Sequence, residues 1–391
     1  TCSMETPATT ASKARLLLNA EPFGFGPTAA IAECFLHLRP LFQTIGYLGK
    51  GHTLDLQKPL PYDRIHDLER EENPEAVFAD YDIFFTALDF EMAGKALAHG
   101  LTVIIYDPLT WYWREIPAVV KDCHLYLSQN FLGVQERLDA CRQAFPAATV
   151  AVPPLVPAQL SETAQAEVAA KRSLTGKPLM LLNLGGLANP YWSDRETLDY
   201  ARLVITTVAR SGIATGKDLV IAGNSRIESE FMGAGARTYS KSQLQEVMRQ
   251  ADLALMTPGL GNIYDAARFN LPTIWLPPAN DSQGQQLDLL RQAGMDDAHL
   301  DWPSFIQEAD GKPLSIDYRH DQEALLQELA GLTTRVCTSE QLLENFASAM
   351  AEAASRLTDK CACADLIAKF GSGGAAHVAE EILQLARKKH P

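Results

Sequence analysis

The residues best suited to hold a phosphorylated ligand lie in one stretch of the C-terminal half, Leu255-Met-Thr-Pro-Gly-Leu-Gly-Asn-Ile-Tyr-Asp265. Its pattern predicts a buried strand that ends at Met256 and a helix that begins a few residues later. Between them, Thr257, Gly259 and Gly261 leave backbone N–H groups unpaired at a helix N-terminus, where the helix dipole adds to their attraction for an anion. The turn therefore favours a diphosphate.

Polar side chains follow this turn at positions that suit the rest of a nucleotide sugar. Asn262 belongs to the turn itself, and Asp265 falls in the first turns of the predicted helix, where its carboxylate can accept two ribose hydroxyls. After the next predicted strand, Asp281, Gln285 and Gln286 offer carboxylate and amide groups that match the hydroxyls of a sugar. These residues form our predicted donor-binding set.

Residues 255–286 resemble the donor-binding signature of the GT-B glycosyltransferases. The resemblance is strongest to the bacterial enzyme that adds N-acetylglucosamine to the peptidoglycan lipid precursor, and to related UDP-sugar transferases. It implies that Asp265 contacts the ribose. It also implies that Asp281, Gln285 and Gln286 contact the donor sugar, with the final pair one residue further along than usual. An ordinary strand-turn-helix with surface amides is the alternative.

Two further segments resemble parts of the same C-terminal domain. Leu181-Leu-Asn-Leu-Gly185-Gly186 is similar to its first strand and glycine turn, where the backbone approaches the phosphates or the acceptor. Ile221-Ala-Gly-Asn224 is placed like the end of its third strand, and Tyr239-Ser-Lys241 like a loop beside the base. Each is equally compatible with a simple turn.

The N-terminal half has its own glycine turn, Asn19-Ala-Glu21-Pro-Phe-Gly24-Phe25-Gly26-Pro-Thr28, after the first predicted strand. The glycines allow a ligand to come close to Gly24, Phe25 and Gly26, and we expect Thr28 to cap the following helix. Glu21 lies at the carboxyl end of the strand, where ligands of parallel sheets bind. The third glycine of a dinucleotide fingerprint is missing, so no nicotinamide site is predicted.

The resemblance also bears on catalysis. Many inverting relatives carry in this loop a histidine that deprotonates the acceptor, and the matching position here is Gly26. Glu21 is the nearest ionisable substitute, as a general base, as an anchor for the acceptor, or as a cap for backbone groups. The stretch Ile45-Gly-Tyr-Leu-Gly-Lys-Gly-His52, taken with Glu21, is similar to cytosylglucuronate synthases, which join UDP-glucuronic acid to a pyrimidine. His52 itself is predicted to be a surface loop residue.

Aromatic side chains follow another predicted strand, in Tyr106-Asp107-Pro-Leu-Thr-Trp111-Tyr-Trp-Arg114. A cluster of rings beside one carboxylate and one guanidinium suits a flat, polar acceptor such as a heteroaromatic ring. We therefore place Asp107 and Trp111 in the acceptor site, although an aromatic seal between domains fits as well. Asp89 follows a predicted strand and either lines this side or caps the next helix.

The elements that must position these residues alternate short apolar runs with helical patterns, which predicts α/β architecture. We expect strands at 15–20, 43–48, 81–86, 102–106 and 124–127, then at 178–183, 218–222, 252–256 and 273–276. Helices are expected at 28–39, 90–99, 131–144, 197–209, 241–250, 263–269 and 285–292. The prediction is two doubly wound Rossmann-like domains facing across a cleft, the GT-B arrangement.

The domain boundaries follow from composition. We predict a loose tail at 1–12, an acceptor-binding domain at 13–153 and a nucleotide-sugar-binding domain at 154–370, with a proline-rich linker after Ala151. Residues 371–391 form a terminal helix with Val378, Ile382, Leu385 and Ala386 on its apolar face. The resemblance implies that this helix packs back on the N-terminal domain.

The bulk composition limits the partners. The 391 residues carry a net charge of -14, which repels nucleic acid polymers and anionic membranes. No apolar run is long enough to cross a bilayer, and the seven scattered cysteines are typical of a cytoplasmic protein. Cys361-Ala-Cys363 has no second pair to complete a zinc site, and we predict no metal or redox role for it.

These observations predict a cytoplasmic glycosyltransferase without metal or cofactor. It would move a sugar from a UDP-like donor to a small polar or heteroaromatic acceptor, for instance UDP-glucuronate to cytosine. The metal-binding Asp-x-Asp of other transferases has no match, because Asp80-Tyr-Asp82 opens a predicted strand. A UDP-sugar 2-epimerase and a non-catalytic nucleotide-sugar-binding partner subunit are the alternatives. The sequence leaves a homodimer open.

Overall fold

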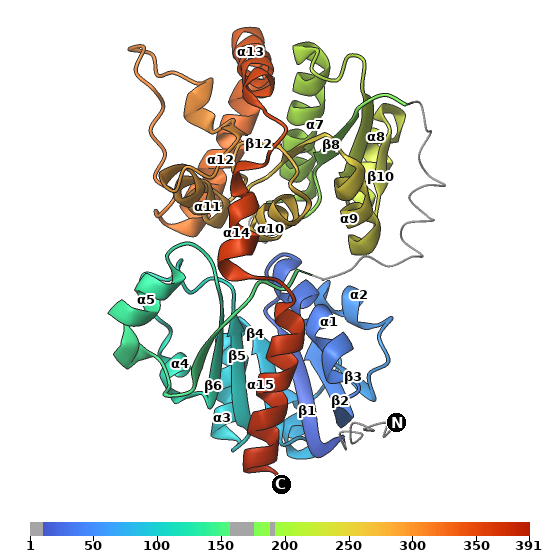
Figure 1. Ribbon diagram of the computed structural model, residues 1–391, viewed down its shortest axis with the longest axis vertical. Helices are drawn as coiled ribbons and strands as arrows, with labels where there is room; N and C mark the ends of the chain where they lie inside the picture. The colour runs from blue at the N-terminus through green and yellow to red at the C-terminus, as the bar shows by residue number, and fades with distance from the viewer. Residues whose placement is uncertain (1–10, 157–175, 188–191) are drawn as a thin grey trace, which may run out of the picture. The chain divides into compact units, whose positions relative to one another are not determined.

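The contacts of the chain divide it into two units, Thr1–Pro157 with Phe370–Pro391, and Ala158–Lys369 (Figure 1). A computed structural model describes residues 11–156, 176–187 and 192–391. The predicted loose tail therefore lies outside the described residues, apart from Ala11 and Ser12, and Ser12 already begins the first strand. Each unit is a parallel sheet covered by helices.

The first sheet has seven strands in the order β3-β2-β1-β4-β5-β6-β7, and every pairing is parallel. The chain order reverses between β1 and β4, and ligands of such sheets bind where the carboxyl ends of the two strands part. The strands are β1 Ser12–Ala20, β2 Phe42–Gly49, β3 Arg64–Asp67, β4 Ile83–Ala87, β5 Thr102–Asp107, β6 Leu125–Gln129 and β7 Thr149–Val152.

Helices cover both faces of this sheet, so its strands are apolar almost throughout. Side chains alternate along β1: Leu16 and Leu18 face the core under α1 and α15, whereas Leu17 faces the core under η1 and α3. The helices are α1 Gly26–Leu38, α2 Thr53–Gln57, η1 Pro74–Asp80, α3 Phe90–Ala98, α4 Ala118–Asp122, α5 Val134–Ala140, η2 Arg142–Ala144 and α15 Gly374–Lys389.

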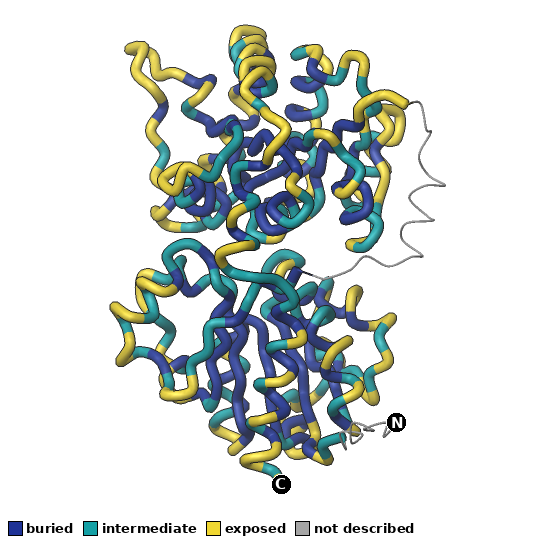
Figure 2. Tube along the Cα trace, in the orientation of Figure 1, coloured by how far each residue is buried: buried dark blue, intermediate teal, exposed yellow. Residues whose placement is uncertain are grey.

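The terminal helix α15 belongs to the first unit although it comes from the end of the chain. It packs against α1 and buries Val378 and Ile382 completely in the core, while Leu385 is half-buried (Figure 2). Its first turn is hydrogen-bonded to residues 154–156, through Gly374 N to Pro154 O and Gly373 N to Val156 O, each at 3.0 Å. The end of the chain therefore completes one face of the first sheet.

The second sheet has six strands in the order β10-β9-β8-β11-β12-β13, again all parallel. Its chain order reverses between β8 and β11, which makes the carboxyl ends of those strands the expected ligand edge. The strands are β8 Leu179–Asn183, β9 Asp218–Gly223, β10 Ala236–Thr238, β11 Leu253–Met256, β12 Thr273–Trp275 and β13 Ala298–His299.

Long helices cover this sheet, with α7 packed against α12 and α13, and α9 against α10. Ser193 and Ser240 begin α7 and α9 with complete capping boxes, which satisfy N–H groups at both helix starts. The helices are α7 Asp194–Ser211, α8 Ser225–Phe231, η3 Met232–Ala234, α9 Lys241–Gln250, α10 Leu260–Phe269, α11 Asp281–Gln292, η4 Trp302–Ser304, α12 Gln322–Cys337, α13 Glu340–Arg356, η5 Ala362–Ala364 and α14 Asp365–Phe370.

The two-domain Rossmann-like fold class is confirmed, and the predicted strands are present with small shifts at their ends. The sequence missed the short edge strands β3, β7, β10 and β13, because their residues are partly polar. The expectation that Thr28 caps α1 is wrong. Its hydroxyl donates to Thr53 O at 2.8 Å from inside the helix, and the cap position is Phe25, with no side-chain bond.

Among the described residues no helix combines the length and apolar character needed to cross a bilayer.

Candidate functional site

Glu21 lies at the ligand edge of the first sheet, directly after β1. Its backbone N–H donates to Ala87 O at the end of β4 at 2.9 Å, so the residue sits at the strand pair where the chain order reverses. Burial, reinforced by the Asp89 carboxylate and opposed by Lys50, raises the pKa of Glu21 to about 7. A carboxylate that titrates near neutral pH is suited to take a proton from a substrate.

Two polar strand ends hold this edge together beneath Glu21. Asn19, 1% exposed, accepts a hydrogen bond from Thr86 Oγ1 at 2.7 Å and donates to Leu48 O at 2.9 Å. These bonds join β1 to both of its neighbours, β4 and β2. The sequence did not lead us to assign a role to Asn19 or Thr86, although a polar residue at the end of an otherwise apolar strand is a signal that could have found them.

The turn between β4 and α3 is strained and carries Asp89. Leu88 has φ of 67°, a left-handed conformation that is costly for a branched side chain. Asp89 Oδ1 accepts from Met92 N at 3.0 Å and caps α3, the capping role left open by the sequence. The pKa of Asp89 is raised, first by burial and then by the nearby Glu91, against the bond from Met92 N. Backbone strain of this kind clusters at functional sites.

The loop Gly24-Phe25-Gly26 is held by a residue that the sequence assigned to the surface. His52 is half-buried, its Nε2 lies 2.5 Å from Gly24 O, and its ring meets Phe25 edge-on at a centroid distance of 5.0 Å. Because a carbonyl can only accept, Nε2 is the donor in this contact. A histidine from the β2–α2 loop thus contacts the loop in which the resemblance expects one.

Asp107 is fully buried at the end of β5, and its carboxylate is hydrogen-bonded to neighbouring groups of the same unit. It accepts from Leu109 N at 2.6 Å, Trp113 Nε1 at 2.7 Å and Tyr126 OH at 2.6 Å. Burial raises the pKa of Asp107 to about 6, although these bonds oppose the shift. The carboxylate therefore orders the loop and the ring of Trp113 rather than facing a ligand.

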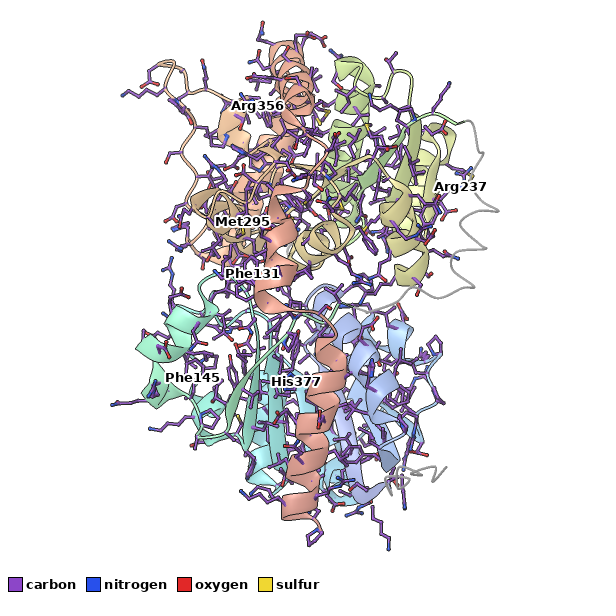
Figure 3. All side chains as sticks on the ribbon, viewed as in Figure 1. Phe131, Phe145, Arg237, Met295, Arg356 and His377 are labelled. Atoms are coloured by element: carbon purple, nitrogen blue, oxygen red, sulfur yellow. The ribbon has the colours of Figure 1, made fainter. Side chains whose placement is uncertain are left out.

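Aromatic rings form a connected half-buried cluster beside Asp89. Trp113 meets Phe90 at 5.3 Å and Tyr112 at 4.9 Å, both edge to face, and Trp111 packs against Phe131, which Figure 3 labels, at 5.8 Å. Trp111 Nε1 donates to Pro108 O at 3.1 Å. Trp113 was not among the residues selected from the sequence. Its indole donates to Asp107 and packs against Phe90, the residue after Asp89.

The ligand edge of the second sheet is built from amides and a hydroxyl. Asn183 ends β8 and donates to Asn262 Oδ1 at 3.2 Å, and Asn262 donates in turn to Thr257 O at 2.9 Å. Asn183 Oδ1 accepts from Gly185 N at 3.0 Å. This network joins the ends of β8 and β11 to the start of α10. Asn183 was predicted only as the end of a strand, without a role in the site.

The glycines of this edge leave room. A Cβ at Gly259 or Gly261 would meet no atom within 4 Å, and the same holds at Gly186, where φ of +79° requires glycine. Gly259 occupies the cap position of α10 without a side-chain bond, and Gly261 lies in its first turn. The expectation that the Gly259 N–H is unpaired is wrong, because it donates to Thr257 O at 2.8 Å. The start of α10 nevertheless has no side-chain cap, and an anion is favoured at such a helix N-terminus.

Two predicted donor residues have contacts that restrict their roles. Asn224 caps α8, its Oδ1 accepting from Arg226 N at 3.1 Å and Ile227 N at 3.0 Å. Asp265 is half-buried on α10 and accepts from Gln245 Nε2 at 3.2 Å. The carboxylate of Asp265 is thus held toward α9, and the oxygen of Asn224 is engaged as a cap.

The three predicted sugar-binding residues are all buried at the start of α11. Asp281 accepts from Gln322 Nε2 at 3.3 Å, and Gln285 donates to Tyr318 O at 2.9 Å. Gln286 is 2% exposed and its Oε1 has no hydrogen-bond partner. Since a buried polar atom without a partner is costly, Gln286 is the member of the set that a ligand would satisfy.

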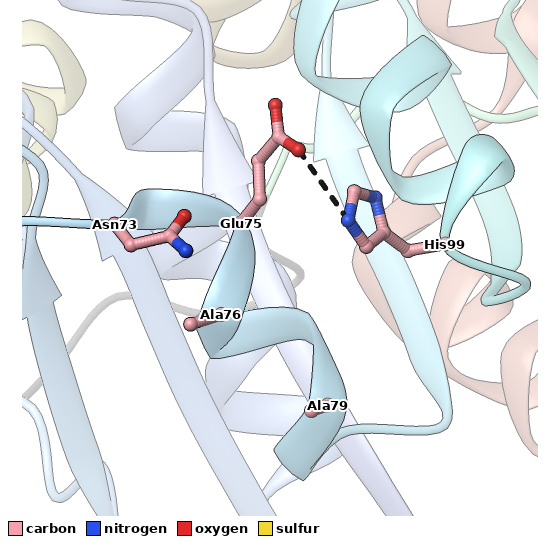
Figure 4. A pocket seen from close by; sticks show the side chains of 5 residues that line it. All are labelled: Asn73, Glu75, Ala76, Ala79 and His99. Carbon is pink, nitrogen blue, oxygen red and sulfur yellow. Dashed lines mark ion pairs between the residues drawn. The ribbon is translucent and has the colours of Figure 1, made fainter.

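A pocket elsewhere in the first unit is unrelated to these edges. It is lined by Asn73, Glu75, Ala76, Ala79 and His99, with an ion pair between His99 Nε2 and Glu75 at 3.4 Å (Figure 4). These residues precede β4 and follow α3, so the pocket lies at the amino ends of the strands. The described residues contain no group of three or more His, Cys, Asp or Glu side chains that could hold a metal ion.

Comparisons with known proteins place the fold. No protein-family model and no curated protein sequence matches the chain. Among solved structures, Arabidopsis thaliana UGT89C1 complexed with UDP is similar at a TM-score of 0.56 and 11% identity, covering 95% of this chain and 99% of that one. CalG4, the calicheamicin glycosyltransferase, is similar at a TM-score of 0.51 and 12% sequence identity, and the match covers 97% of this chain and 100% of CalG4. Acinetobacter baumannii MurG is similar at a TM-score of 0.50 and 12% sequence identity, and the match covers 96% of this chain and 100% of MurG.

At such low identities the likeness concerns the architecture. The matches cover nearly the whole of this chain, so they include both of the parallel sheets described above. The chain has the GT-B fold of these glycosyltransferases.

Proposed function

We propose that this protein is a metal-independent glycosyltransferase that uses a UDP-sugar donor and a small, flat, polar acceptor. In this proposal residues 13–153 bind the acceptor, residues 154–370 bind the donor, and the helix of residues 371–391 completes the acceptor domain. The observation that carries the proposal is the glycine turn at the β8/β11 edge of a GT-B fold, where α10 begins without a side-chain cap beside the Asn183–Asn262 network.

On the donor side, the diphosphate would lie against the start of α10, at Gly259 and Gly261. Asp265 would accept hydroxyls of the ribose, and the unpartnered oxygen of Gln286 would accept a hydroxyl of the sugar. Gly185 and Gly186 offer a second backbone turn at the end of β8. UGT89C1, a structural neighbour, was solved with UDP, which supports this choice of nucleotide.

On the acceptor side, Glu21 would take the proton and Trp113 would provide a ring for a flat molecule to stack on. The buried Asp107 would act as a positioning residue, because its bond to Trp113 Nε1 fixes the indole. A heteroaromatic acceptor with an exchangeable N–H, such as cytosine, meets both requirements. UDP-glucuronate as donor remains part of this finer proposal on the strength of the sequence resemblance.

The reaction balances without a metal. Glu21 accepts the proton from the acceptor nitrogen or hydroxyl, the acceptor forms a bond to the anomeric carbon, and the bond from that carbon to the diphosphate breaks. The departing UDP carries the negative charge, which the N–H groups at the start of α10 stabilise. Positioning of the two substrates provides the remaining acceleration.

The test is a thermal-shift panel with UDP, GDP, dTDP and NAD, because a ligand bound only by the folded protein raises its stability. UDP should give the largest shift. A matched variant, Gly261→Ala, should fold as stably as the wild type, since its Cβ enters open space, yet should bind UDP more weakly. A preference for NAD, or equal UDP binding by the variant, would contradict the donor site.

A second measurement separates the alternatives. The protein is incubated with UDP-sugars, with and without cytosine or a simple phenol, and UDP and sugar products are followed. Acceptor-dependent release of UDP supports glycosyl transfer. Release of a free epimerised sugar without acceptor would identify a UDP-sugar 2-epimerase, and binding without turnover would identify a nucleotide-sugar-binding subunit.

A further inference from the structure

Two cysteines meet inside the second unit, away from both ligand edges. Cys361 and Cys363 lie between α13 and α14, with exposed fractions of 4% and 1%, and their Sγ atoms are 3.1 Å apart. From the sequence we predicted no metal or redox role for this pair, because it lacks further ligands for a metal and lies in a helical region; the contact between the two sulfurs leads to a different interpretation. Among the described cysteines these two are a thiol pair in direct contact.

The contact requires a special backbone. Side chains at i and i+2 share one face of a strand but are separated by two residue rises, about 6.6 Å, and in a helix they point to well-separated sides, so neither regular structure brings their sulfur atoms into contact. Here Cys361 is extended, with φ of -80° and ψ of 122°, and the short helix η5 follows at once. Ala364 N donates to Cys361 O at 3.1 Å and closes the turn that makes the two sulfurs converge.

Polar side chains from two other segments hold this turn in place. Asn270, the left-handed residue that ends α10, accepts from Cys361 N at 2.9 Å. Asp297 accepts from Ala362 N at 2.7 Å and, with its other oxygen, from Thr273 N at 3.1 Å. The backbone on both sides of the first cysteine is therefore fixed, and the sulfurs are held in contact rather than meeting by chance rotation.

We propose that Cys361 and Cys363 are a redox-active dithiol that closes to an intrachain disulfide with a disulfide oxidant such as oxidised glutathione. One thiolate attacks a glutathione sulfur, which releases one glutathione thiol and leaves a mixed disulfide. The second cysteine then attacks the protein sulfur, which releases the other glutathione thiol. The protein loses two protons and two electrons, and one oxidised glutathione becomes two thiols.

The surroundings explain how such a pair stays reduced until an oxidant arrives. The contact with Cys361, followed by burial, raises the pKa of Cys363 well above its ordinary value, so Cys363 rests as a thiol. The segment immediately before it, Thr358, Asp359 and Lys360, is exposed. Small local movements of that segment are enough to admit the oxidant.

Closure would change the turn that leads from α13 into α14. Cys363 Sγ lies 3.6 Å from Ile263 O, a carbonyl inside α10, and the disulfide removes the S–H donor from this contact. It would also make the short turn between the two cysteines covalent. The proposal does not depend on the proposed transferase function, because neither cysteine is among the residues that we place in the donor or acceptor site.

The test uses the folded, full-length protein. It is equilibrated in buffers of increasing oxidised-to-reduced glutathione ratio, quenched in acid, alkylated with N-ethylmaleimide in denaturant and digested with trypsin. Cleavage after Lys360 and Lys369 yields one peptide, residues 361–369, that contains both cysteines. As the proportion of oxidised glutathione rises, this peptide should change from the doubly alkylated form to an unalkylated form. The unalkylated form should be two hydrogens lighter than the reduced, unmodified peptide. Reduction before alkylation should restore the doubly alkylated peptide.

The buried single cysteines Cys34 and Cys123 are internal controls and should stay fully alkylated. In Cys363→Ser the lighter form should vanish, while Cys361 becomes alkylated or carries glutathione. The wild-type titration decides the question even if that variant folds poorly. A peptide that remains doubly alkylated while the half-buried Cys141 takes up glutathione would overturn the proposal, as would a stable mixed disulfide that never closes.

Discussion

The ligand edges of the two sheets are built on the same plan from different chemistry. In each, an asparagine ends the first strand and binds across the point where the chain order reverses: Asn19 to Thr86 in the first unit, Asn183 to Asn262 in the second. Above Asn19 stand carboxylates whose pKa values are raised, whereas beside Asn183 stand glycine N–H groups and amides. The first edge is equipped to move a proton and the second to hold an anion.

The difference follows from the charge that the groups of each edge carry. Carboxylates held close together, as Glu21 and Asp89 are, repel each other, and burial increases the cost of their charge, so one proton is retained near neutral pH. Backbone N–H groups at a helix start carry partial positive charge at every pH. We therefore expect variants at the first edge to change turnover, and variants at the second edge to change donor affinity.

The largest effect should come from Glu21→Gln. The substitution keeps the size of the side chain but removes its ability to accept a proton, so turnover should fall by roughly 10²–10⁴-fold with donor affinity nearly unchanged. The matched control is Glu91→Gln, which removes an exposed carboxylate from the same edge and should have little effect. A loss of acceptor affinity alone would make Glu21 an anchor. Wild-type turnover would move attention to Asp89 and His52.

At the second edge, Asp265→Ala should weaken UDP binding by about 1–3 kcal/mol, because it removes charge-assisted hydrogen bonds to the ribose. Turnover at saturating donor should stay close to that of the wild type. The control Gln245→Ala breaks the same internal hydrogen bond but keeps the carboxylate, and should bind UDP normally. If both variants lose UDP equally in titration calorimetry, Asp265 serves the helix and not the ribose.

The pH dependence should distinguish the edges again. A base must be ionised to accept a proton, so with a pKa of about 7 Glu21 is mostly protonated at pH 6 and mostly ionised at pH 8. Turnover should rise by about tenfold over that interval, while UDP affinity changes little.

Charge variants sharpen this prediction. Asp89→Asn removes a like charge and should move the rising limb to lower pH, whereas Lys50→Gln removes an opposing charge and should move it to higher pH. A limb that stays in place in both variants would assign the titration to another group.

The smallest effect concerns the frame of the first edge. A Cβ at Gly374 would lie 1.9 Å from Pro153 O, a backbone atom that cannot rotate away, so Gly374→Ala should destabilise the first unit by about 1–3 kcal/mol in urea unfolding. The control is Gly331→Ala in the middle of α12, where a Cβ meets nothing within 4 Å. That variant should be neutral or slightly more stable. Equal stability of the two variants would show that α15 tolerates displacement from residues 153–156.

The sequence alone determined the alternation of elements and the ends of the central strands. Buried parallel strands must be apolar along their length and end in turns, and this pattern can be read locally in segments such as 179–183 and 253–256. The glycine turn before α10 was predicted for the same reason, since an open helix start leaves a local signature. Asp89 at the start of α3 was likewise visible as a strand end followed by a helix.

Only the tertiary structure decided which side chains face one another. Asp107 looked like a ligand contact, but three donors from Leu109, Trp113 and Tyr126 enclose it. His52 looked like a surface residue, and it is the packing of α2 against α1 that brings it to Gly24, 28 positions earlier in the chain. Contacts of this kind depend on how separate elements pack, and no spacing along the chain records them.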